Sequence, residues 1–61
     1  MANPAQAFEV GDRVQIVADA QPQSYEITDA YINKDERVWM YSLKAEGADE
    51  VKSVKEGELE R

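Results

Sequence analysis

The side chains able to do chemistry in this 61-residue chain are mostly carboxylates. Cysteine and histidine are absent, which excludes thiol and imidazole catalysis, disulfides and thiolate zinc sites. Paired carboxylates act as acid and base when burial separates their pKa values. The acid pairs are Asp35-Glu36, Asp49-Glu50, and Glu56 with Glu58. All fall in predicted turns, where water solvates them, so we expect no enzyme activity, no cofactor and no metal site.

The charge balance narrows the choice of partner. Seven Lys and Arg stand against thirteen Asp and Glu, a formal net charge of −6 at pH 7. This excess of acids opposes binding to a phosphate backbone and disfavours nucleic acid as a partner. No apolar run approaches the roughly 20 residues of a membrane-spanning helix, and no signal peptide is recognisable. We therefore expect a cytoplasmic protein without a membrane segment.

The stretch from Arg37 to Lys44 organises the predicted fold. It contains the only tryptophan, Trp39, together with Tyr41, Leu43 and other apolar residues. Aromatic and β-branched residues at this density favour a strand, and eight residues is an ordinary strand length. We predict that it is the central strand of one small β-domain.

The other strands are predicted from alternating apolar and polar residues and from the turns between them. Gly11 and Gly47 are expected to take positive φ in two of these turns. Val51 is expected to face the core. The predicted elements are strands at residues 13–18, 24–33, 50–54 and around Leu59, with one turn of 3₁₀ helix at 55–58 before the last strand.

In the predicted strand 24–33, strict alternation does not put all the apolar side chains on one face of the sheet. It places Tyr25 and Ile27 on one side and Ala30 and Ile32 on the other. A β-bulge near residues 28–29 shifts the phase by one residue and brings all four to the core side. A bulge also bends the strand, as the closing of a small barrel requires.

The register of the hairpin between 24–33 and the central strand has two readings. A two-residue loop, 34–35, pairs Tyr31 with Val38, whereas a three-residue loop pairs Tyr31 with Trp39. A slip of one residue exchanges the two faces of the sheet. We favour the two-residue loop, because it places Trp39, Tyr41 and Leu43 together on the core side.

That choice leaves an apolar group on the opposite face, which we call the outer patch: Tyr31, Val38 and Met40. Aromatic residues and methionine are enriched at the centres of protein interfaces. Arg37 lies at the edge of the patch near the hairpin end. We therefore predict Tyr31, Val38, Met40 and Arg37 as candidate partner-binding residues.

Three segments resemble SH3-like β-barrels: the F-x-V-G-D-x-V opening at Phe8–Val14, the segment Val38–Tyr41, and Glu56–Glu60. The resemblance implies an all-β domain over residues 8–61, a five-stranded antiparallel barrel with a short 3₁₀ turn before the last strand. Residues 1–7, which are Ala-rich and contain Asn3-Pro4, are predicted to be a disordered lead-in.

The SH3-like superfamily implies a class of function but no single partner. We expect a small, acidic, non-catalytic binding or adaptor module that engages a protein partner or self-associates as a homodimer. The alternative is a nucleic-acid-associated module of Tudor or KOW type, which the net negative charge disfavours. The chain has no Ala-Leu-Tyr-Asp-Tyr-like segment of the kind found in peptide-binding SH3 domains, which disfavours polyproline recognition. Its aromatics lie mostly in predicted strands and not in a cage on loops, which disfavours a Tudor-type methyl-lysine reader.

Overall fold

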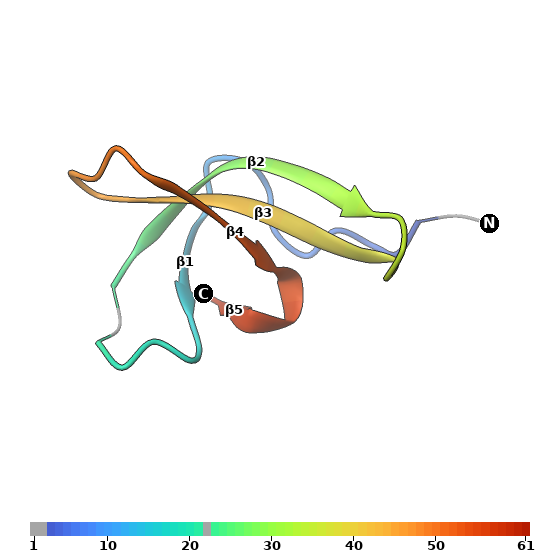
Figure 1. Cartoon of the computed structure of the whole chain (residues 1–61), viewed down its shortest axis with the longest axis horizontal. Coiled ribbons are helices and arrows are strands. Elements are labelled where there is room, and N and C mark those ends of the chain that lie inside the picture. Colours follow the sequence, from blue (N-terminus) through green and yellow to red (C-terminus); the bar gives the residue numbers. More distant parts are fainter. Residues whose placement is uncertain (1–2, 22) are drawn as a thin grey trace.

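The computed structural model describes residues 3–21 and 23–61 and consists mainly of β-strands (Figure 1). The first two residues of the predicted lead-in lie outside this range. The elements are β1 (Arg13–Ile16), β2 (Tyr25–Asn33), β3 (Val38–Ala45), β4 (Val51–Lys55), the 3₁₀ turn η1 (Glu56–Glu58) and β5 (Leu59–Glu60). The predicted all-β class and the 3₁₀ turn before the last strand are confirmed.

The five strands form one antiparallel sheet in the order β4-β3-β2-β1-β5. The long strands β2 and β3 form the middle of the sheet, and β1 lies between β2 and β5, with its pairing to β2 limited to Tyr25 and Glu26. In the part of the chain that the structure describes, the edge strands β4 and β5 do not pair, so the sheet is open. No helix of the described residues is both long and apolar enough to cross a membrane.

The predicted bulge in β2 is present. Ile27 pairs with Leu43 and Asp29 with Ser42, so Thr28 is the extra residue. The phase shift brings three of the four predicted residues to the core: Tyr25 and Ile27 are buried before the bulge, and Ala30 packs against the same core after it. Ile32 is half-buried opposite Trp39 and does not belong to the core cluster.

The hairpin register differs from both predicted alternatives. Asn33 pairs with Val38 and Tyr31 with Met40, which makes the loop four residues long, Lys34–Arg37. The favoured register is therefore wrong by two residues. Because a shift of two keeps every side chain on its face, Trp39 still lies on the core side and Met40 on the outer side.

The side chain of Asn33 explains the longer loop. Its Oδ1 accepts hydrogen bonds from the backbone N–H groups of Asp35 at 3.0 Å and Glu36 at 3.2 Å. Arg37 then takes the left-handed conformation, with φ of 58°, and its N–H donates to the Asn33 carbonyl at 2.7 Å. Local hydrogen bonds from a side chain give the backbone N–H groups of the turn their acceptors. These hydrogen bonds favour the four-residue loop over a two-residue loop.

The core lies on one face of the sheet, which curls around it. Trp39 packs against this core but stays half-buried, at the rim and not at the centre. The prediction that Val51 faces inward is wrong: Val51 is 55% exposed, because it pairs with Lys44 on the outer face. The buried residues are Phe8, Val14, Tyr25, Ile27, Tyr41, Leu43 and Leu59.

Candidate functional site

The indole of Trp39 is hydrogen-bonded to the segment that precedes the sheet. Trp39 lies near the start of β3, opposite Ile32 of β2. Its Nε1–H donates a 2.7 Å hydrogen bond to the carbonyl oxygen of Pro4, 35 residues away in sequence. Buried or half-buried tryptophan needs such an acceptor for its single donor. Residues 3–7, which we call the strap, therefore reach the Trp39 end of the core.

A shallow groove of about 280 Å³ lies beside this contact. We call it the Trp39 groove. Its walls come from the start of β3, the end of β4, η1 and the strap, and they are mainly apolar. An open, mainly apolar hollow with a few polar groups at its edge is the usual form of a binding site. The lining residues are Pro4, Arg37, Val38, Trp39, Lys55 and the three residues of η1.

The carboxylate of Glu56, at the start of η1, fastens the strap to the core. Its Oε1 accepts hydrogen bonds from Tyr41 Oη at 2.7 Å and from the backbone N–H of Ala7 at 2.8 Å. Tyr41 Oη in turn accepts a bond from the N–H of Phe8 at 3.2 Å. One oxygen of Glu56 thus links the buried ring of Tyr41 to the end of the strap.

Burial of Tyr41, its hydrogen bond to Glu56 and the negative charge of Glu56 all raise the pKa of the Tyr41 phenol above its ordinary value of 10.0. Since the folded state keeps this proton to higher pH than the unfolded state, the stability that it contributes is complete below pH 10. It is lost as the pH rises from there through the raised pKa.

We therefore expect the free energy of unfolding to fall as the pH rises above about 10. Tyr41→Phe should flatten this dependence while lowering stability at pH 7, because it removes the bond to Glu56. Tyr31→Phe is the matched control, because it removes a phenol from the exposed face. Urea unfolding at pH 7 to 11 checks the prediction, and equal slopes in the two variants would contradict it.

The four predicted partner-binding residues are divided between two places. Tyr31 and Met40 face each other across β2 and β3 on the outer side, and Tyr31 is 40% exposed. The Tyr31 hydroxyl donates to Ser53 Oγ of β4 at 3.0 Å, so its side chain spans β3. Arg37 and Val38 line the Trp39 groove instead.

An ion pair closes one edge of the outer patch. Lys55 Nζ donates to Glu36 Oε1 at 2.6 Å, from β4 to the hairpin loop. This bond and the charge of Glu36 raise the pKa of Lys55. Both side chains are about half exposed, so the pair positions the loop more than it stabilises the fold.

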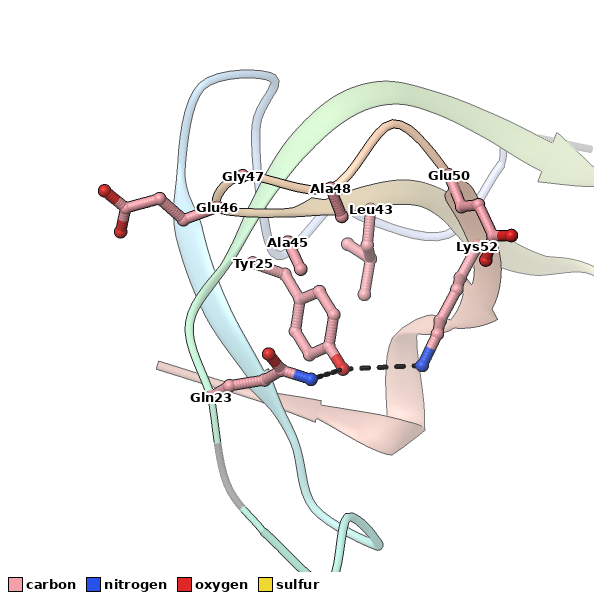
Figure 2. Close-up of a pocket in the computed structure, with 9 residues that line it drawn as sticks. All are labelled: Gln23, Tyr25, Leu43, Ala45, Glu46, Gly47, Ala48, Glu50 and Lys52. Carbon is pink, nitrogen blue, oxygen red and sulfur yellow. Dashed lines mark hydrogen bonds between the residues drawn. The ribbon is translucent and has the colours of Figure 1, made fainter.

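A second hollow, of about 300 Å³, lies at the opposite end of the sheet, over the ring of Tyr25 (Figure 2). Tyr25 Oη accepts from Gln23 Nε2 at 2.9 Å and from Lys52 Nζ at 3.4 Å, and it donates to Asp19 Oδ2 at 3.0 Å. The Lys52 ammonium also lies 5.4 Å from the centre of the ring.

These contacts use every hydrogen-bonding position of the phenol, which has one donor and two acceptor sites. The Tyr25 phenol is thus fully bonded to Gln23, Lys52 and Asp19, whereas the side chain of Glu46, which also lines the hollow, points away from it (Figure 2). In the Trp39 groove, the indole N–H of Trp39 donates to a peptide carbonyl, that of Pro4. We take the Trp39 groove as the candidate functional site for this reason.

Sequence reasoning missed this groove. It placed Trp39 in the core and treated residues 1–7 separately, and no local pattern connects Pro4 with Trp39. Within the described residues, no group of three or more acidic side chains is placed to hold a metal ion. No protein-family model, curated protein or solved structure matches the chain.

Proposed function

We propose that this chain is a small non-catalytic binding module of SH3-like type, and that its Trp39 groove takes an extended, proline-containing segment of a partner protein. The strand order, the bulge that bends β2 and the 3₁₀ turn before β5 support an SH3-like relationship. The net charge of −6 favours a protein partner over nucleic acid.

One observation carries the proposal: the 2.7 Å bond from Trp39 Nε1 to the Pro4 carbonyl. The strap of the same chain forms one wall of the groove, so a proline-containing segment already contacts Trp39 there. Proline fixes its own φ and restricts the residue before it to extended conformations. Such a peptide loses little conformational entropy on docking, which is why aromatic-lined grooves select it.

The small size of the groove limits its affinity for a peptide. A hollow of about 280 Å³ contacts only a few side chains of a ligand. Interfaces well below 1,200 Å² are typical of weak, transient encounters. We therefore expect dissociation constants of roughly 0.1–1 mM for a short peptide, or about 4–5.5 kcal/mol of binding free energy.

Binding can be tested with the strap sequence itself. The probe is a capped synthetic peptide with the sequence of residues 1–7, titrated into a full-length Ala7→Pro chain. This substitution removes the N–H that bonds Glu56 and so loosens the strap of the chain itself. We expect saturable binding by calorimetry and a matching change in the fluorescence of Trp39, the only tryptophan.

Two controls sharpen this measurement. Ala7→Ser keeps the backbone N–H, so its strap should compete and weaken peptide binding roughly two- to tenfold, given a tethered concentration in the mM range. A peptide with alanine in place of proline should bind more weakly, because it is less extended. Absence of saturable binding to Ala7→Pro at several mM peptide would remove the groove as a peptide site.

A further inference from the structure

We infer that Arg37 selects the ligand of the Trp39 groove by binding a carboxylate, so that the preferred partner segment carries an aspartate or glutamate about two residues from its proline. The inference rests on the proposed function, because it names the chemistry of the segment that the groove takes. Three observations carry it: the backbone conformation of Arg37, the place of its side chain, and the edge of β3 that β4 leaves unpaired.

The backbone of Arg37 adopts a conformation that suits glycine better than arginine. Its φ is 58°, and among residues 3–21 and 23–61 every other positive φ belongs to a glycine, Gly11 or Gly47. A residue with a Cβ atom costs free energy in this left-handed region. Strain of this kind clusters at functional sites, which points to a function of the arginine side chain.

The side chain of Arg37 lies where a ligand in the Trp39 groove can meet it. It lines this groove and also a second hollow, of about 240 Å³, which it shares with Lys34. Both cations belong to the loop of the β2–β3 hairpin, in a chain whose net charge is −6. An arginine has five N–H donors in a planar fork, so contacts within its own chain leave donors for a carboxylate.

The acidic side chains of the groove are directed at donors of the fold itself. Glu56 Oε1 accepts hydrogen bonds from Tyr41 and Ala7, and Glu58 Oε2 accepts one from the backbone N–H of Lys55 at 3.4 Å. Both acids belong to η1 and would repel a carboxylate placed beside that turn. A ligand carboxylate is therefore expected at the hairpin end of the groove, next to Arg37.

The start of β3 offers an unpaired backbone edge beside Arg37, because β3 extends past the end of β4 (Figure 1). The β3–β4 ladder ends at Met40 and Lys55, so within the described residues Val38 and Trp39 have strand partners only in β2. An extended segment can bind such an edge through its main chain, and an edge strand tolerates proline. Because a strand rises about 3.3 Å per residue, a ligand residue about two positions from a proline at Trp39 lies level with Arg37.

Matched peptides test the inference on the full-length Ala7→Pro chain. The parent is the capped peptide of residues 1–7, and its Gln6→Glu variant differs from it only by a carboxylate two residues after the proline. A second pair, Ala2→Gln and Ala2→Glu, places the same difference two residues before the proline. At about 150 mM salt only charges within about 8 Å act strongly. We expect one acidic peptide to bind roughly three- to tenfold more tightly than its neutral twin, as measured by calorimetry.

Arg37→Gly in the same chain should abolish this preference, while its urea midpoint should be no lower. Lys44→Ala removes a cation from the far end of β3, opposite Glu26, and as the matched control it should keep the preference. Equal affinities of both acidic peptides and their neutral twins for the chain with Arg37, or a preference that survives Arg37→Gly, overturns the inference. A marked drop in the urea midpoint of Arg37→Gly overturns it as well, because the arginine would then be needed for the stability of the loop. The parent peptide decides the proposed function separately, since a groove that binds it without preferring an acid remains a peptide site.

Discussion

Leu43→Ala is expected to remove a large part of the free energy of unfolding of this domain and to lower its urea midpoint sharply. Leu43 has no exposed surface and lies in β3, between the bulged strand β2 and β4. Replacing a fully buried leucine by alanine costs about 2–5 kcal/mol, including the cavity that remains. A domain of 61 residues has a total stability of about 3–9 kcal/mol. The expected loss of free energy is thus a large part of the total stability of the domain.

Far-UV circular dichroism and urea unfolding followed by Trp39 fluorescence measure this effect. Val51→Ala is the control, since Val51 also lies in a strand but is 55% exposed. Its free energy of unfolding should change by no more than about 0.5 kcal/mol. If Leu43→Ala had the urea midpoint of the wild type, the apolar cluster around Leu43 would not be what stabilises the fold.

Glu56→Ala is expected to lower the free energy of unfolding by about 1–3 kcal/mol and to free the strap. The substitution leaves the hydroxyl of Tyr41, a fully buried residue, without its carboxylate acceptor, and it removes the acceptor of the Ala7 N–H. Bonds to a charged acceptor are stronger than neutral ones, and an unmet buried donor is costly.

Glu56→Gln separates the hydrogen bonds from the charge, because its amide oxygen still accepts. Glu56→Gln should lower the free energy of unfolding by about half as much as Glu56→Ala does. Glu46→Ala removes a carboxylate from an exposed turn and should be nearly neutral. Urea unfolding gives the stabilities, and the indole N–H shift of Trp39 reports release of the strap. An unchanged shift in a destabilised Glu56→Ala chain would show that Glu56 holds the core but not the strap.

Much of the fold could be predicted because its determinants are local. Alternation along β2, interrupted between Ile27 and Ala30, already required a bulge, and the structure places it at Thr28. Gly11 and Gly47 take the positive φ expected of them, 96° and 78°. The inward position of Leu43 followed from period-two alternation, which is independent of the loop that precedes the strand.

The length of the hairpin loop and the orientation of Val51 could not be predicted, because each depends on which nearby groups pair with one another. The hairpin loop is longer than expected because Asn33 bonds two N–H groups within it and Arg37 accepts a positive φ. Non-glycine residues seldom take that conformation, so the sequence carries little signal of it. Val51 was misplaced because a short edge strand with one apolar neighbour, Val54, does not define its own phase.

The candidate site was the least accessible part to sequence reasoning. Tyr31 and Met40 lie together on the outer side, whereas Val38 lines the Trp39 groove, and the use of these residues by a partner stays a prediction. The Trp39 groove arises from a contact between Pro4 and Trp39, which are joined by no pattern of spacing. An irregular segment makes its long-range contacts with the surface of the folded sheet. Local sequence patterns carry no information about that surface.

The pairing of the strands also determines the order in which the chain can assemble. Strands β2, β3 and β4 are successive hairpins, so each pairing closes a short loop and has a small entropic barrier. The pairing of β1 with β5 joins Ile16 to Leu59 across most of the chain. The three-stranded meander is therefore the natural folding nucleus, and the two-residue strand β5 is added late. A polypeptide emerging from the ribosome would build most of its sheet before it could seat its last strand.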